Sequence, residues 1–189
     1  MGWSGLEAFL ASVGLVALAE VGDKTQLLSL ALAAKYRRPL PILAGIAIAT
    51  LLNHALAGAF GTWLTDALGQ RVLQIAVALS FLAMAGWMLV PDKPSELSLP
   101  ARLGVLATTT VAFFLVEMGD KTQLATVALA ARYDSFYAVV GGTTLGMLLA
   151  NAPVVVFGPR LLQRVPVRAV QRVAALLFAA LGLLALYHA

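Results

Sequence analysis

A seven-residue motif of acidic, basic and amide side chains occurs twice in this chain, each time inside a long apolar stretch. Residues 20–26 read EVGDKTQ, and residues 117–123, at an offset of 97, read EMGDKTQ. A charged side chain in hydrocarbon costs about 2.5 to 3.5 kcal/mol on insertion scales, so such residues are rare outside functional sites. The same costly residues in the same order predict one polar site built from two copies.

Composition places the chain in a lipid bilayer. It is 61% hydrophobic and 12% charged, with a mean hydropathy of +0.90, whereas a soluble domain has about 25% charged residues. The chain has no cysteine, which excludes disulfides and thiolate metal sites. Its basic residues cluster at the ends of apolar runs, a pattern typical of topology determinants and not of a nucleic-acid surface.

Six apolar runs are long enough to cross a membrane, and they comprise residues 6–34, 40–64, 72–90, 103–131, 136–157 and 167–187. A helical crossing needs about 20 residues. Only helices and closed barrels satisfy the backbone in lipid, and runs without strict alternation favour helices. We therefore predict an all-α membrane protein with six transmembrane helices.

The distribution of lysine and arginine predicts the orientation. Nine lie in the first, third and fifth loops, and only Arg71 and Arg132 lie on the opposite side. The positive-inside rule places the richer side in the cytoplasm. Both termini are therefore expected to lie outside.

The register of the repeat extends well beyond the motif. Residues 20–36 and 117–133 are identical at 12 of 17 positions, and Phe81 aligns with Phe178 at the same offset. We predict two three-helix repeats, which occupy residues 1–90 and 101–189 and are joined by a cytoplasmic linker at 91–100. Because three is odd, the second repeat must enter the membrane from the opposite side. Transporters with such inverted repeats bind their substrates near the bilayer midplane.

The two runs that carry the motif are longer than the membrane requires. Each has 29 residues, or about 43 Å of straight helix at 1.5 Å per residue. Tilting would accommodate the excess. A break at Gly22 and Gly119 would also do so, and it would expose backbone carbonyls to the site.

The motif supplies mainly oxygen donors. The predicted metal ligands are Glu20, Asp23, Gln26, Glu117, Asp120 and Gln123, with Lys24, Thr25, Lys121 and Thr122 in supporting roles. When all are ionised, four carboxylates and two ammonium groups leave a net charge of −2, which one divalent cation or two protons would neutralise. Ca²⁺, Mn²⁺ and Mg²⁺ all prefer such oxygens.

Each residue type in the motif has an expected role. We expect Glu20 and Glu117 to bind metal and carry protons, and the two aspartates to ligate the metal directly or through water. The lysines compensate charge. On a continuous helix Lys24 would pair with Glu20 and Lys121 with Glu117, because residues at i and i+4 share a face.

Other polar and small residues fall inside the predicted second and fifth helices. His54 aligns with Asn151, and an interhelical hydrogen bond is a better-supported use of His54 than metal ligation, which stays open. The sequences GTTLG at 142–146 and GIAIA at 45–49 predict close-packed helix faces.

At the two motifs the chain resembles the manganese/calcium–proton exchanger family, which includes Golgi cation exchangers and bacterial manganese exporters within the LysE-type exporters. That family carries two Glu-x-Gly-Asp-(Lys/Arg)-(Ser/Thr) motifs, and residues 20–25 and 117–122 both fit. The resemblance implies a multi-pass antiporter without a prosthetic group that exchanges Mn²⁺, or Ca²⁺, for protons. For so compact a chain it suggests Mn²⁺ export across a bacterial plasma membrane.

Alternative functions use the same acids differently. An exporter of a small cationic organic solute, such as an amino acid, would use them as counter-charges. A passive channel ranks lower because two lysines would impede cations. An enzyme ranks lowest, and a structural ion-pair network is the non-functional alternative. The sequence leaves open whether the protein forms a homodimer.

Overall fold

The computed structural model describes residues 5–90, 104–158 and 166–187, and these residues form helices and no strand. The helices are α1 (Gly5–Ala19), α2 (Lys24–Tyr36), α3 (Pro39–Ala67), α4 (Gln70–Trp87), α5 (Val105–Glu117), α6 (Lys121–Tyr133), α7 (Phe136–Phe157) and α9 (Val167–Tyr187). The predicted all-α class is confirmed. The predicted linker at 91–100 lies outside the described residues.

Both helices that were predicted to carry the motif are broken at it. The first run forms α1 and α2, which meet at an angle of 72°, and the fourth forms α5 and α6. The breaks contain Gly22 at φ +80° and Gly119 at φ +74°, a conformation that glycine adopts at little cost. Of the two alternatives, tilting or breaking, the structure shows breaking.

The described helices include four that are long and apolar enough to cross a bilayer, namely α3, α4, α7 and α9, and the bent pair α1–α2 makes a fifth. The predicted span at 103–131 does not qualify as one helix. Its apolar half, α5, has only 13 residues, and α6 carries Lys121 and Arg132. A membrane protein with four or five candidate spans is therefore shown, and the sixth span remains a prediction.

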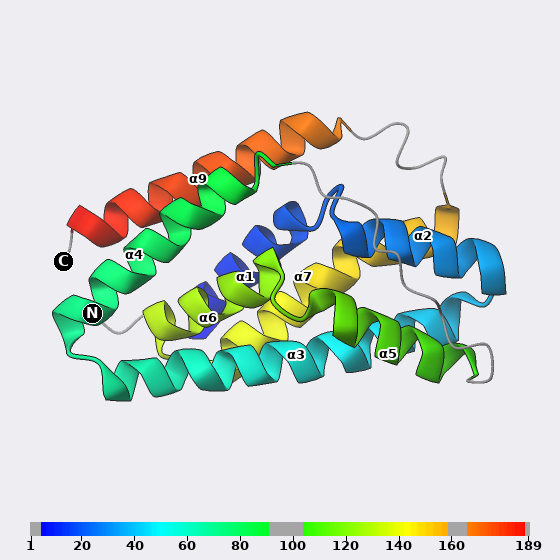
Figure 1. The fold of residues 1–189 in the computed structure, drawn as a ribbon, viewed down its shortest axis with the longest axis horizontal. Coiled ribbons are helices and arrows are strands. Elements are labelled where there is room, and N and C mark those ends of the chain that lie inside the picture. The colour runs from blue at the N-terminus through cyan, green and yellow to red at the C-terminus, as the bar shows by residue number, and fades with distance from the viewer. Residues whose placement is uncertain (1–4, 91–103, 159–165, 188–189) are drawn as a thin grey trace.

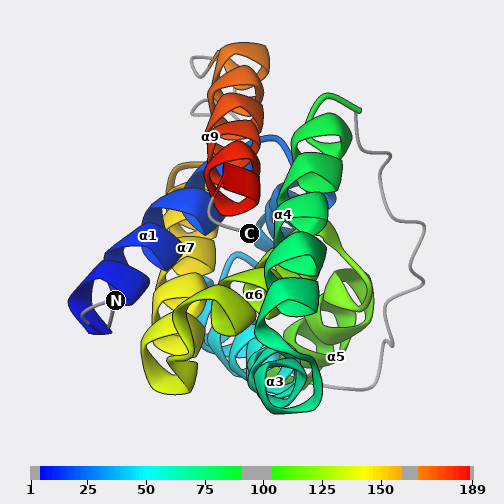
Figure 2. The ribbon, with the colours of Figure 1, turned by 90° about the vertical axis from the view of Figure 1, so that its left-hand side faces the viewer.

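Each broken helix packs mainly against an unbroken helix from the other half of the chain. α1 packs on α7, and α5 and α6 pack on α3. The unbroken helices α4 and α9, which also come from different halves of the chain, pack on each other. Figure 1 shows that α1–α2 and α5–α6 run in opposite directions along the long axis, with their breaks near its middle. Figure 2 looks along that axis and shows α4 and α9 on one side of the molecule, with α3 and α5 on the other.

Small residues let these helices approach closely. A Cβ added at Gly142 would lie 2.6 Å from the Phe9 carbonyl oxygen, and one at Gly146 would lie 2.7 Å from that of Val13. In the other half, a Cβ at Gly45 would lie 2.9 Å from the Leu106 carbonyl oxygen. The predicted close-packed faces at 142–146 and 45–49 are confirmed.

Candidate functional site: an acidic centre between two helix breaks

Two aspartates stand at the starts of the helices that follow the breaks. Asp23 occupies the N-cap position of α2 and Asp120 that of α6, yet neither carboxylate caps its own helix. Instead they form ion pairs across the repeat. Lys24 Nζ lies 3.2 Å from Asp120 Oδ1, and Lys121 Nζ lies 3.6 Å from Asp23 Oδ1. The two copies of the motif therefore meet in one place.

These crossed pairs correct the predicted pairing within each motif. Lys24 was expected beside Glu20, and Lys121 beside Glu117, because four residues separate them on a continuous helix. The break at each glycine turns the chain between the glutamate and the lysine, so the helical spacing no longer applies. Each lysine contacts the aspartate of the other copy instead.

Three buried carboxylates form a group that could hold a metal ion. One oxygen each from Glu20, Asp23 and Asp120 lies within 4.8 Å of the other two. Glu20 is fully buried, and its Oε2 accepts a hydrogen bond from Thr25. Its Oε1 has no hydrogen-bond partner among the described residues. A buried carboxylate oxygen is costly to leave unpaired, and a cation is one partner that could satisfy this atom.

Glu117 is buried close by but has different partners. Its Oε1 accepts a hydrogen bond of 2.8 Å from Thr50, and its Oε2 accepts one of 3.2 Å from Asn53 Nδ2. Within the described part of the chain, Glu117 stands outside the group of three. Sequence reasoning gave Thr50 and Asn53 no role. The pattern that could have indicated them is a pair of polar side chains three residues apart, which lie on one face of an otherwise apolar helix.

Gln26 and Gln123 stabilise the breaks. Gln26 Oε1 accepts a hydrogen bond of 2.9 Å from the Gly22 N–H, and Gln123 Oε1 accepts one of 2.6 Å from the Gly119 N–H. Gln26 Nε2 also donates to the Ala150 carbonyl oxygen of α7 at 2.9 Å. These oxygens satisfy backbone groups that a broken helix leaves without partners. Their predicted role as metal ligands stays a prediction.

The remaining predicted polar residues are buried as well. Thr122 is buried next to Lys121. His54 is fully buried, and neither ring nitrogen has a hydrogen-bond partner among the described residues, so its predicted interhelical bond is not found. Its counterpart Asn151 accepts a 2.7 Å hydrogen bond from Ser29 of α2 and thereby joins α2 to α7.

The electrostatics of the centre favour a cation. Asp120 and Glu117 lie close enough to Glu20 for repulsion between like charges. With all six groups ionised, two ammonium groups balance four carboxylates only in part and leave a net charge of −2. The C-terminal ends of α1 and α5 point into the same region and add partial negative charge, while the N-terminal ends of α2 and α6 add partial positive charge.

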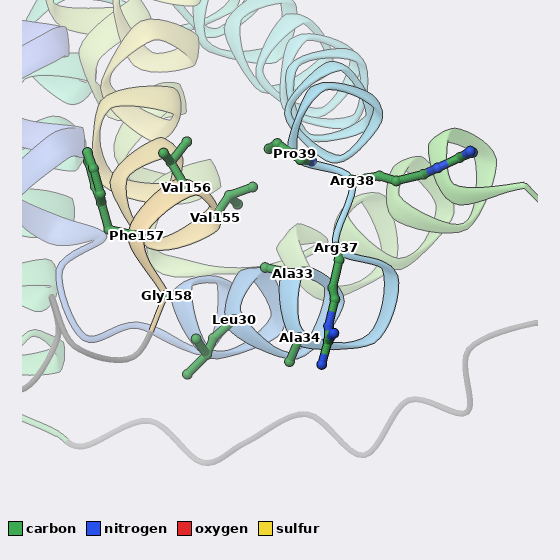
Figure 3. A pocket seen from close by; sticks show the side chains of 10 residues that line it. All are labelled: Leu30, Ala33, Ala34, Arg37, Arg38, Pro39, Val155, Val156, Phe157 and Gly158. Atoms are coloured by element: carbon green, nitrogen blue, oxygen red, sulfur yellow. The ribbon is translucent and has the colours of Figure 1, made fainter.

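A separate cavity lies elsewhere among the described residues. It has a volume of about 420 Å³ and is lined at the C-terminal end of α2 and the end of α7 by mainly apolar side chains, with Arg37 and Arg38 at its edge. In Figure 3, Arg38 points away from Val155 and Val156. None of the motif acids lines this cavity, so it is not part of the acidic centre.

Comparison with known proteins identifies relatives over nearly the whole chain. A family model described as "Divalent cation/proton antiporter GDT1" matches residues 8–96 and 105–189. A Vibrio cholerae protein described as "Putative manganese exporter" is 50% identical over 91% of this chain and 86% of its own length. The Saccharomyces cerevisiae "Divalent cation/proton antiporter GDT1" is 23% identical over 98% of this chain and 85% of its own. No solved structure matches the chain.

Proposed function

The chain belongs to the GDT1 family of divalent cation/proton antiporters, and from this premise we propose that it exports Mn²⁺ from the cytoplasm in exchange for protons. Membership makes it a transporter and not an enzyme. The choice of manganese is supported by the relative from Vibrio cholerae, which is described as "Putative manganese exporter" and is identical to this chain at half of the aligned residues.

The observation that carries the proposal is the group of three buried carboxylates. Glu20 comes from the first copy of the motif together with Asp23, and Asp120 comes from the second, and their ligand oxygens lie within 4.8 Å of one another. Hard divalent cations prefer such oxygens. A site with a net charge of −2 accepts either one divalent ion or two protons, which is the requirement for exchanging them.

The same proposal includes an architecture. Two inverted repeats of three helices would place the breaks at the midplane, and the opposite directions of α1–α2 and α5–α6 support this arrangement. The excess of basic residues in the first, third and fifth loops supports external termini. We place the protein in a bacterial plasma membrane.

The test is flux into proteoliposomes that carry a pH gradient. Addition of external Mn²⁺ should move protons and metal together in opposite directions, with Ca²⁺ and Mg²⁺ as comparison ions. Glu20→Gln should abolish exchange because it removes a ligand and a proton carrier, whereas Glu7→Gln, at an exposed position in α1, should exchange like the wild type.

Two results would count against this function. Proton movement that is independent of any metal would show that the two fluxes are not coupled. Export of labelled lysine or arginine without metal would instead support the organic-solute exporter, which uses the same carboxylates as counter-charges.

A further inference from the structure

The two copies of the motif have different partners at their glutamates. Building on the exchange function above, we propose that Glu20 is a ligand of the transported ion, whereas Thr50 and Asn53 hold Glu117 away from the ion and couple the ion site to α3. Thr50 and Asn53 are thus positioning residues, and the two repeats have unequal tasks.

The hydrogen bonds of the two glutamates differ in kind. Both oxygens of Glu117 accept hydrogen bonds from α3, at 2.8 Å from Thr50 and 3.2 Å from Asn53. Glu20 instead interacts with threonines of the two motifs: Thr25 donates a hydrogen bond to its Oε2, and the Thr122 hydroxyl also lies close to its carboxylate. Its Oε1 has no hydrogen-bond partner among the described residues. Of the two glutamates, Glu20 is thus the one with an oxygen that has no hydrogen-bond partner among the described residues.

This difference is encoded in the sequence and does not depend on one conformation. At the repeat offset of 97, the counterparts of Thr50 and Asn53 are Met147 and Ala150. Neither side chain has a hydrogen-bond donor. A movement that exchanged the positions of the two repeats could not give Glu20 the partners that Glu117 has.

The same contacts connect the ion site to a transmembrane helix. Asn53 Nδ2 also donates a 3.0 Å hydrogen bond to the Phe114 carbonyl oxygen, in the last turn of α5. The end of α5 is thus attached to α3 at a side chain and at the backbone. Asp120, which belongs to the group of three, follows Glu117 by three residues. Displacement of Asp120 by a bound ion would therefore act on α3.

The first test separates ion binding from transport. Mn²⁺ affinity is measured on purified protein by electron paramagnetic resonance of the free ion, and transport is measured in proteoliposomes. Glu20→Gln should weaken binding by about 10- to 100-fold, as expected for loss of an anchoring group at a metal site. Glu117→Gln should stay within about threefold of wild-type affinity, since its partners are Thr50 and Asn53. Both variants should lose transport.

The second test addresses the positioning residues. Thr50→Val keeps the shape of the side chain and removes the donor. Combined with Asn53→Leu, it should lower the maximal transport rate by about tenfold, the size of effect that a hydrogen bond to a charged group has, while Mn²⁺ affinity and KM stay unchanged. Thr50→Ser restores the hydroxyl and should recover the rate. The control is Thr143→Val, because the Thr143 hydroxyl donates to carbonyl oxygens of its own helix, at Val139 and Val140, within the part of the chain that the structure describes.

Each result decides the proposal. Equal loss of affinity in Glu20→Gln and Glu117→Gln would overturn it, as would an unchanged transport rate in the Thr50→Val, Asn53→Leu variant. Thermal melting identifies a variant that has merely unfolded, and in that case the single Thr50→Val variant and its serine rescue decide. Failure of the wild type itself to bind Mn²⁺ or to couple it to protons would refute the proposed function instead.

Discussion

Lys121 shows how the acidic centre tolerates so much charge. Its side chain is 1% exposed, and the ammonium group lies 3.6 Å from Asp23. Removing one partner of a buried ion pair is strongly destabilising, because the remaining charge then lies in a low-dielectric interior without a counter-charge. Lys121 is therefore a structural requirement of the site as well as an electrostatic one.

We expect Lys121→Met to lower stability by about 3 to 5 kcal/mol, the cost of breaking a buried ion pair by removing one partner. Adding Asp23→Asn in the same chain should recover part of the loss, since it removes the uncompensated carboxylate. Lys35→Met is the matched control, because Lys35 is exposed in the last turn of α2. The free energy of unfolding in detergent is measured for all three variants. Equal losses for Lys121→Met and Lys35→Met would contradict the burial argument.

The sequence predicted which residues meet but not how they pair. The duplicated motif indicated a shared site, and three of its four acids, Glu20, Asp23 and Asp120, do come together at the two breaks. The pairing within each motif was wrong because it assumed an unbroken helix. Thr50 and Asn53 were not recognised because their role depends on which face of α3 lies against α5, and one apolar helix sequence does not determine that.

At the scale of helices, the breaks depend on two glycines with different surroundings. Gly22→Ala should cost more stability than Gly119→Ala. Both positions have positive φ, which costs an L-residue about 1 to 2 kcal/mol. A Cβ at Gly22 would also lie 2.1 Å from Val167 Cγ1, whereas a Cβ at Gly119 would have no neighbour within 4 Å. Gly14→Ala, in the middle of α1 and in open space, should be neutral or stabilising by up to about 1 kcal/mol. Thermal melting ranks the three.

Helix contacts across the repeat can be tested at two adjacent glycines. Gly142→Ala should disrupt the packing of α7 on α1, because the new Cβ would lie 2.6 Å from the Phe9 carbonyl oxygen. Gly141→Ala places its Cβ at an ordinary 3.8 Å from the Phe9 ring and should be tolerated. Expression level and melting temperature compare them. Equal tolerance would mean that α1 and α7 do not approach as closely as described.

Whether the two long runs would tilt or break could not be decided from the sequence. Both solutions fit 29 apolar residues into the bilayer, and glycine is common in transmembrane helices in either case. The break is favoured here by contacts that are distant in sequence, such as that between Gln26 and Ala150 of α7. The close-packed glycine faces, by contrast, were predictable, because their spacing of four residues is a local property.

At the scale of the whole molecule, large apolar side chains face outward on many helices. Leu176 and Leu183 of α9 are 70% and 61% exposed, and Trp63 of α3 is 57% exposed. In water this surface would cause aggregation, whereas in lipid it is the expected exterior. Because lipid is as apolar as these side chains, helix association depends on close packing and polar contacts.

The predicted orientation is tested by reporters at the C-terminus. Alkaline phosphatase, which is active only outside the cytoplasm, should be active when fused there, and a cytoplasmic fluorescent reporter should be dark. A reporter joined after Arg37, on the basic side, should give the reverse pattern. A cytoplasmic C-terminus would refute the charge-based topology.

The crossed ion pairs have a consequence for how the chain could have evolved. Each lysine compensates an aspartate of the other copy of the motif, since Lys24 contacts Asp120 and Lys121 contacts Asp23. After an ancestral duplication, a charge change in one copy would have to be matched in the other. These four positions would therefore have to change together, while the rest of the two halves could diverge in sequence.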